Sequence, residues 1–231
     1  MSTPPGSTQQ RRILEKLMTS KRAGLAEDEV PLEGSPERIL DTALVEISSN
    51  GLRRFTVDRL AKRVGLSRVT IYRHFPGKEG ILEAVLLREM RSFMRQVGEV
   101  VSRYERLDDR LVEGVVFALT WLREHALLQR LLHSEPELIL PLLTTSGAPV
   151  VQLGREFVTS FARRQDEAAA LSLDDQQLNM LSEILTRIVI SMLLTPESAV
   201  PMQTEPEIRA FAEGYLRPLV ATFVRAPLSS P

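Results

Sequence analysis

The sequence predicts an all-α fold, and three observations lead to it. Apolar residues recur every three to four positions over long stretches of the chain. Residues that favour helix starts precede these stretches, and glycine or proline follows them. No run of period-two alternation bounded by turn residues is present. With 231 residues, 43% of them hydrophobic, the chain is long enough to bury a sizeable core.

The positions of the helix signals divide the chain into three parts. Residues 1–34 are polar, and we expect a flexible N-terminal arm, in which apolar residues spaced over 11–25 indicate a short amphipathic helix. Two interpretations of this arm stay open: an extra contact to DNA or to a partner, or a loose tail. Residues 35–82 predict three short helices, and residues 83–231 predict a larger helical domain.

The composition excludes several classes of chemistry. Without cysteine, the chain has no disulfide, no zinc–thiolate site and no cysteine nucleophile. No segment approaches the roughly 20 apolar residues of a membrane span, and the polar start lacks the apolar core of a signal peptide, so we expect a cytoplasmic protein. Charge is distributed unevenly along the chain, although the net charge is only −1. Residues 35–80 carry nine Lys/Arg against five Asp/Glu, and residues 81–231 carry 15 against 20. This basic segment predicts that a polyanion meets the protein at residues 35–80.

The first two short helices have clear boundaries. Ser35 as N-cap and Pro36 at the first helical position start one helix, which Gly51 ends in the left-handed conformation. Thr56 caps the next helix, and Gly65 turns the chain after it. The predicted buried faces are apolar stripes at helical spacing, namely Ile39, Leu40, Ala43, Leu44 and Ile47, then Leu60, Ala61 and Val64.

The third short helix completes a recognisable geometry. Ser67 caps it, Ile71 and Phe75 lie four residues apart on its inner face, and Pro76–Gly77 ends it. Short helices joined by a tight glycine turn make a helix-turn-helix, whose last helix enters the major groove of DNA. We therefore predict a three-helix DNA-binding domain at 35–82, followed by a helical regulatory and dimerisation domain.

The start of this helix faces base edges in such a docking mode. We predict that Arg68, Val69 and Thr70 read the sequence, because a guanidinium pairs with guanine and a valine contacts the thymine methyl. The capping Ser67 joins this contact set.

The next turn and the neighbouring helix starts supply phosphate contacts. We predict such contacts from Tyr72, Arg73 and His74, and from Thr56 and Lys78 at helix N-termini. Each has an ordinary alternative: a packed ring for Tyr72, a local cap for His74, a solvated charge for Lys78. Their joint occurrence in the basic segment favours DNA.

The stretch from Phe55 to Leu82 resembles the DNA-binding domain of TetR-family regulators. Its specific part is Gly65-Leu-Ser, then Thr70-Ile-Tyr-Arg-His-Phe, then Lys78-Glu and Leu82. The resemblance implies base contacts near Arg68, Val69 and Thr70 and backbone contacts at Thr56, Tyr72, His74 and Lys78. It also implies a homodimer and a small-molecule inducer. The arm before residue 35 is longer than the family's usual short lead.

The remaining sequence predicts helices at about 78–104, 108–124, 126–132, 135–143, 148–168, 174–194 and 205–225. In the family that the chain resembles, the last two long helices pair across a twofold axis as a four-helix bundle. We adopt this arrangement as the predicted dimer. Its candidate interface residues are Leu181, Ile184, Leu185, Ile188, Met192, Tyr215, Leu219 and Phe223.

An inducer site is expected among the helices that follow the DNA-binding domain. Its candidate lining residues are Met94, Phe117, Trp121, His125, Phe157, Phe161, Met180 and Met192. The alternative for each is ordinary core packing. Because the set is mostly apolar, with Trp121 and His125 as the polar anchors, it favours a hydrophobic ligand such as a fatty acyl group, a lipid or a drug.

Together these features predict a repressor that such a ligand releases from a pseudo-palindromic operator. A regulator of the same fold that is controlled by a partner, or an activator without an inducer, stays an alternative. An enzyme is not expected: His125 and His133 do not have the spacing of a helical metal pair, and no G-x-S-x-G, P-loop or dinucleotide motif is present. We expect no metal and no cofactor.

Overall fold

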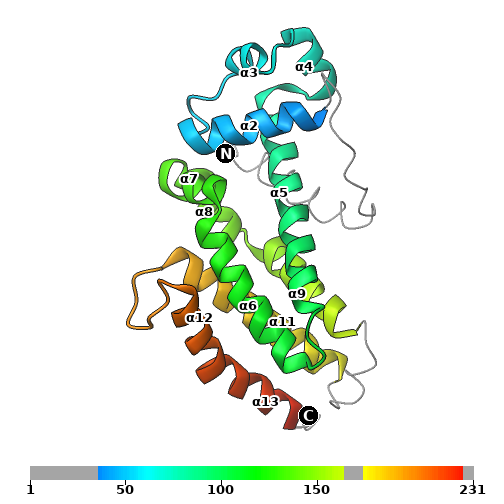
Figure 1. Ribbon diagram of the computed structural model, residues 1–231, viewed down its shortest axis with the longest axis vertical. Coiled ribbons are helices and arrows are strands. Elements are labelled where there is room, and N and C mark those ends of the chain that lie inside the picture. Colours follow the sequence, from blue (N-terminus) through cyan, green and yellow to red (C-terminus); the bar gives the residue numbers. More distant parts are fainter. Residues whose placement is uncertain (1–35, 164–173, 226–231) are drawn as a thin grey trace, which may run out of the picture. The chain divides into compact units, whose positions relative to one another are not determined.

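Helices form every regular element of the computed structural model within its described residues, 36–163 and 174–225 (Figure 1). Those two ranges contain no strand, so the all-α prediction is confirmed. The predicted arm with its helix at 11–25 and the predicted cap Ser35 lie outside the described residues.

The first three helices are α2 (Pro36–Asn50), α3 (Val57–Val64) and α4 (Arg68–His74). The predicted ends of α2 and α3 and the predicted starts of α3 and α4 are confirmed by the cap geometry. The Thr56 hydroxyl accepts a hydrogen bond from the Arg59 amide at 3.3 Å, and the Ser67 hydroxyl accepts one from the Thr70 amide at 3.1 Å. Gly51 and Gly65 end α2 and α3 with φ of 79° and 77°, which is a conformation that glycine adopts without strain.

The apolar faces of these helices are buried as the stripes predicted, except that Leu40 and Leu44 of the first stripe are half-buried. The buried side chains are Ile39, Ala43, Ile47, Phe55, Leu60, Ala61, Val64, Ile71 and Phe75. Each fully buried large side chain contributes roughly 1.5–3 kcal/mol relative to its exposure to water. This core fixes the angle between α3 and α4.

The later helices are α5 (Gly77–Val101), α6 (Leu107–Glu124), α7 (Ala126–Ser134), α8 (Pro136–Leu143), α9 (Ala148–Arg163), α11 (Asp175–Leu194), α12 (Glu205–Phe211), η1 (Ala212–Leu216) and α13 (Arg217–Arg225). The described chain forms two compact units. One holds residues 36–91 with 125–149, and the other holds 92–124 with 150–163 and 174–225. Helices α7 and α8 thus fold with the first three helices, and α5 belongs to both units, whereas the sequence placed one boundary after residue 82.

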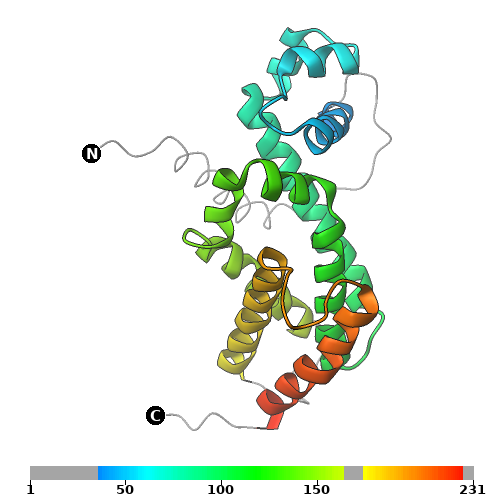
Figure 2. The same ribbon diagram turned by 90° about the vertical axis from the view of Figure 1, so that its left-hand side faces the viewer.

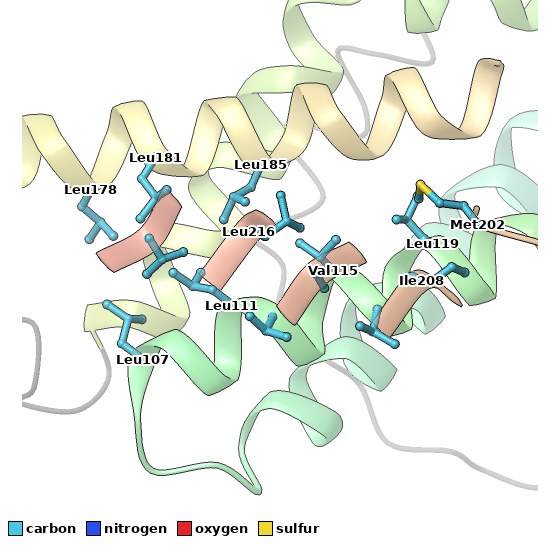
Figure 3. Close-up of a cluster of buried hydrophobic side chains, with 14 residues drawn as sticks. Leu107, Leu111, Val115, Leu119, Leu178, Leu181, Leu185, Met202, Ile208 and Leu216 are labelled. Atoms are coloured by element: carbon cyan, nitrogen blue, oxygen red, sulfur yellow. The ribbon is translucent and has the colours of Figure 1, made fainter. Parts of the chain in front are cut away.

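In the second unit, α6 and α11 pack against the helix that runs from α12 to α13 (Figures 1 and 2). Leucine and valine side chains from all of them interlock in a core that Met202 closes at one end (Figure 3). Leu111 from α6 and Leu185 from α11 lie near its middle, and Leu119 lies beside Met202. The aliphatic stripes of the sequence therefore serve mainly to hold this protomer together.

Helix α11 has the length and the mean hydropathy, 1.3, of a helix able to cross a membrane, and it is the one described helix that does. Its buried side chains Leu178, Leu181 and Leu185 face the core of the second unit. The Asp174 carboxylate caps its start, and Gln177 completes a capping box. Core packing therefore accounts for its apolar character.

The predicted helix at 205–225 contains a π-helical turn, η1, between α12 and α13. Ala212 and Leu216 are buried at the two ends of this turn, while Tyr215 between them is 70% exposed. The wide turn changes which side chains face the core, and periodicity over one uninterrupted helix does not capture that change.

A buried carboxylate joins α2 to α3. Glu46 on α2 is buried, and it accepts hydrogen bonds from Arg63 and from Asn50, with Arg59 at 3.6 Å. The Arg63 guanidinium, through its hydrogen bond, holds the pKa of Glu46 below its usual value of 4.5, against the opposing effect of burial. The charged form of Glu46 is therefore part of the fold.

We predict that Glu46→Gln lowers the free energy of unfolding by about 1–2 kcal/mol near neutral pH, because hydrogen bonds from half-exposed guanidinium groups to a charged acceptor weaken. A lowered folded-state pKa stabilises the fold fully above the unfolded value, near 4.5, and the gain is lost as pH falls through the folded value. The difference between wild type and variant in urea unfolding should thus shrink below about pH 4.5. An undiminished difference at pH 3 would contradict this role, and Glu99→Gln on the exposed side of α5 is the control.

Candidate nucleic-acid interface

Helix α4 presents large side chains to solvent. Val69 is 78% exposed and Tyr72 is 52% exposed, and Arg68 and Arg73 are exposed beside them. Ile71 points the opposite way and is completely buried. The helix is therefore anchored by one face, and the other face offers a guanidinium pair with two apolar surfaces, which suits base and phosphate contacts rather than packing.

The capping hydroxyl groups have structural partners. Thr56 and Ser67, both exposed, accept from backbone amides of their own helices, and the Ser67 and Thr70 hydroxyl groups lie 3.0 Å apart. Thr56 was expected to keep its hydroxyl for phosphate; its oxygen already accepts the Arg59 amide, so a DNA contact would use the hydroxyl hydrogen. The hydroxyl groups of Thr56 and Ser67 would therefore serve both as helix caps and as contacts to DNA.

An ion pair holds the predicted base-reading arginine. The Arg68 guanidinium lies 3.0 Å from the Asp58 carboxylate of α3, and both side chains are well exposed. A pair of this kind contributes about 0–1 kcal/mol to stability. Sequence reasoning missed Asp58 as a neighbour of Arg68, since ten residues and a turn separate them.

Lys78 and His74 are half-buried rather than fully exposed. The His74 ring lies 6.3 Å from that of Phe75, which ends α4. Lys78, in the first turn of α5, lines an open cavity of about 220 Å³; the other lining residues are Leu52, Arg53, Glu79, Leu82 and Glu135. His74 is thus the last residue of the recognition helix, and Lys78 follows it at the start of α5, within the same unit.

Helices α7 and α8 are tied to α2 by polar contacts. The buried Glu135 accepts a hydrogen bond from the Arg53 amide at 2.9 Å and pairs with its Nε at 3.3 Å. Glu137 reaches Nη2 of Arg53 at 2.8 Å, and Arg130 donates to the Ser49 carbonyl at 2.5 Å. Sequence reasoning missed this junction; its one signal was the acidic pair around Pro136.

The aromatic candidates for the ligand site lie in the second unit. The rings of Phe117 and Trp121 lie 6.5 Å and 4.9 Å from that of Phe93, a residue the sequence analysis did not select. Phe157 and Phe161 form an edge-to-face pair at 4.6 Å. All five are half-buried, as is Met94.

Two ligand-site candidates lie elsewhere. His125 belongs to the first unit, where Nε2 is 3.0 Å from Glu89 and Nδ1 accepts the Leu128 amide as the cap of α7. Its polar atoms are thereby engaged in structure. Met180 is 42% exposed on α11, so it does not face the interior of the protomer.

The candidate residues of the dimer interface fall into two groups, one buried within the protomer and one with exposed surface. Leu181 and Leu185 are buried in the core of their own unit, so their surfaces are not available to a partner, and this part of the prediction needs correction. The physical reason is that helical periodicity marks an apolar face without saying which chain covers it. The other candidates keep exposed or half-exposed surface, namely Ile184, Ile188, Met192, Tyr215, Leu219 and Phe223.

Capped short helices, a left-handed glycine turn and an exposed recognition face define a helix-turn-helix DNA-binding protein. Residues 39–85 match the family model described as bacterial regulatory proteins, tetR family, and residues 107–213 match the bacterial tetracyclin repressor C-terminal domain. The chain belongs to the TetR family of transcriptional regulators.

Curated relatives match over shorter stretches. The HTH-type transcriptional regulator SrpR of Pseudomonas putida is 39% identical over 54 residues, 23% of this chain and 25% of the relative. The fatty acid metabolism regulator protein of Bacillus subtilis is 30% identical over 74 residues, 32% of this chain and 38% of the relative. The matched stretch therefore spans well under two thirds of the length of these relatives.

Solved structures show the same fold at low identity. The TetR family repressor AlkX from Dietzia sp. has a TM-score of 0.57 at 22% identity, over 84% of this chain and 98% of its own. The regulator FadR from Bacillus subtilis in complex with stearoyl-CoA has a TM-score of 0.51 at 16% identity, over 82% and 97%.

We predict that Glu135→Ala lowers the free energy of unfolding by about 1–3 kcal/mol, because it removes the acceptor of the Arg53 amide and a buried charge partner. Glu137→Ala is the matched control, since it removes an exposed carboxylate from the same arginine and should cost below about 1 kcal/mol. Urea unfolding measures both. Equal costs would show that burial of Glu135 does not strengthen the junction.

Proposed function

We propose that this regulator is a repressor that binds a pseudo-palindromic operator as a homodimer and leaves it when a small, hydrophobic ligand binds. The observation that carries the DNA-binding part is the solvent-exposed face of α4. Exposed Val69 and Tyr72 lie beside Arg68 and Arg73 on a helix whose other face is anchored in the core. Exposure of such large side chains has no folding benefit, and contact with DNA would bury them.

The contacts divide by role. Arg68, Val69 and Thr70, with the cap Ser67, lie in the first turn of α4, which faces base edges in this docking mode. Thr56 and Lys78 are at the starts of α3 and α5, where helix N-termini attract phosphate, and Tyr72, Arg73 and His74 follow along α4. The first group would set specificity and the second affinity.

Dimerisation would use the surface that the second unit leaves open on α11, η1 and α13. Tyr215 is the most exposed apolar side chain there, and Ile184, Ile188 and Leu219 keep partial exposure. A twofold axis through this surface places two copies of α4 on one face of the DNA, with half-sites about 34–36 Å apart or a multiple of that.

Release requires that the ligand bind the DNA-incompetent arrangement more tightly than the competent one. The chain connects the second unit to the three-helix DNA-binding part, α2 to α4 (the reading head), in two places. Helix α5 runs from Phe93 back to Lys78, and α6 is followed by His125 and then by α7, which contacts α2. The half-buried aromatic groups favour an apolar ligand. The structure of FadR was solved with stearoyl-CoA, and AlkX is implicated in biodegradation of n-alkanes, which supports this ligand class.

We predict that Lys78→Ala and Tyr72→Ala each weaken binding to an operator isolated by selection from random DNA. Loss of the Lys78 charge should act on all sequences alike and reduce the salt slope of log K by about 1. Arg68→Ala should instead cost about 1–3 kcal/mol at one base pair and relax selectivity there. Gel-shift titrations at several salt concentrations measure these effects.

Arg95→Ala is the control, because it removes an exposed arginine that lies on α5, beyond the first unit. Its operator affinity should equal that of the wild type. If Lys78→Ala and Tyr72→Ala also bind like the wild type, the contact assignment is wrong.

We predict that the protein is a dimer at micromolar concentration and that Tyr215→Glu makes it monomeric. The substitution places a charge in the proposed interface, and within the protomer it removes the ring contact with Phe211 at 5.6 Å, while the tyrosine is 70% exposed. Leu140→Glu, on the 39% exposed leucine of α8, is the control and should stay dimeric. Sedimentation velocity measures both, and a monomeric wild type would refute the dimer proposal.

A further inference from the structure

Arg123, in the last turn of α6, lacks a counter-ion. Within residues 36–163 and 174–225, no carboxylate lies at ion-pair distance from its guanidinium. Its Nε is fully buried and has no hydrogen-bond partner. Burial lowers the pKa of this guanidinium, and no neighbouring charge acts on it. Arg123 as a whole is half-buried, but a buried N–H donor without an acceptor is costly, and an anionic acceptor would satisfy it and compensate the charge as well.

One terminal nitrogen of Arg123 caps the end of α11. Nη2 of Arg123 donates to the Met192 carbonyl at 3.3 Å. This carbonyl belongs to the last turn of α11, where backbone acceptors have no partner within the helix. The cap accounts for one terminal nitrogen, and it leaves both the Nε donor and the positive charge unsatisfied.

A second unsatisfied donor lies one turn earlier. The Thr120 hydroxyl is buried and has no hydrogen-bond partner. Residues three apart are neighbours on a helix surface, so Thr120 lies next to Arg123 along α6. Phe117 is a further turn back, and its ring stacks on Phe93 at 6.5 Å. A cationic donor, a hydroxyl and an aromatic surface thus follow one another along α6.

We propose that this part of the second unit binds an organic carboxylate with an apolar body. One carboxylate oxygen accepts Arg123 Nε, the other accepts the Thr120 hydroxyl, and the apolar body packs on the rings of Phe93 and Phe117. A water molecule would satisfy the hydrogen bonds but leave the charge uncompensated, whereas a carboxylate satisfies both. A phosphate brings more negative oxygens than these two donors serve. The proposal names the ligand class of the proposed function, and only its regulatory consequence rests on that function.

The test compares anion and alcohol of equal chain length. Octanoate, decanoate and dodecanoate are titrated into the full-length protein, with octanol, decanol and dodecanol in parallel, by melting temperature and calorimetry. We expect a carboxylate of this series to raise the melting temperature and to bind about tenfold or more tightly than its alcohol, the ratio expected for a charge-assisted hydrogen bond. Alcohols that stabilise as well as the acids would overturn the proposal, as would a series without any binding.

Substitutions of Arg123 test whether its guanidinium is the group that binds the carboxylate. Arg123→Gln should remove the preference for the acid, and Arg123→Lys, which keeps the charge, should restore part of it. Arg95→Gln, on an exposed arginine of α5, matches the change in net charge and should bind like the wild type. Equal preference in Arg123→Gln and Arg95→Gln would overturn the site.

Thr120→Val tests the same site independently, and it is informative even if the Arg123 variants do not fold. Valine is close in volume to threonine and removes an unsatisfied buried hydroxyl, so the unliganded protein should be at least as stable as the wild type. Its acid preference should nevertheless fall. A purely structural role for Thr120 predicts no change in that preference.

Operator binding separates this inference from the proposed function. A carboxylate that binds through Arg123 without changing operator affinity supports the site and refutes release by this ligand. Wild type that binds its operator but shows no acid preference refutes the site and leaves the DNA-binding proposal standing.

Discussion

The reading head depends on helix α2, which is held by polar contacts on two sides. On one side its buried Glu46 draws Arg59 and Arg63 of α3 toward it. On the other side its last turn and the following loop accept α7 and α8, through Arg130 on the Ser49 carbonyl and through Glu135. Because charge-assisted hydrogen bonds are directional, α2 cannot turn without breaking one set or the other. The orientation of the recognition helix is therefore coupled to α7.

Different interactions stabilise the core of the second unit and, within the first unit, the junction of α7 and α8 with α2. The second unit packs aliphatic side chains of α6, α11 and α12, and dense apolar packing resists gradual change. The junction of α7 and α8 with α2 and the loop after it combines ion pairs and hydrogen bonds of Arg53 and Arg130 with close packing of α7 on α2, and Leu127 and Leu131 of α7 are buried. The junction therefore depends on directional polar contacts in addition to apolar packing, whereas the core of the second unit is aliphatic.

Sequence reasoning predicted what is decided locally. Thr56, Gly65 and Ser67 set helix boundaries through contacts within four residues, and all three behave as predicted. It did not predict pairings between distant segments, such as Glu135 with Arg53, because spacing along the chain says nothing about which surfaces meet. Leu181 shows the same limit: its stripe was correctly apolar, but whether the chain or a partner covers it depends on tertiary packing.

The other arginines of the second unit show why Arg123 stands out. Arg209 pairs with Glu113 and Glu205, and Arg217 pairs with Asp108, Asp109 and Glu213; these carboxylates raise the pKa of both guanidinium groups. Arg123 shifts the other way, because burial acts on it alone. An anion bound there removes the cost of the unpaired charge and so stabilises the arrangement of α6 and α11 that holds it. Helix α6 is joined to α7 through the single residue His125, and α7 contacts α2.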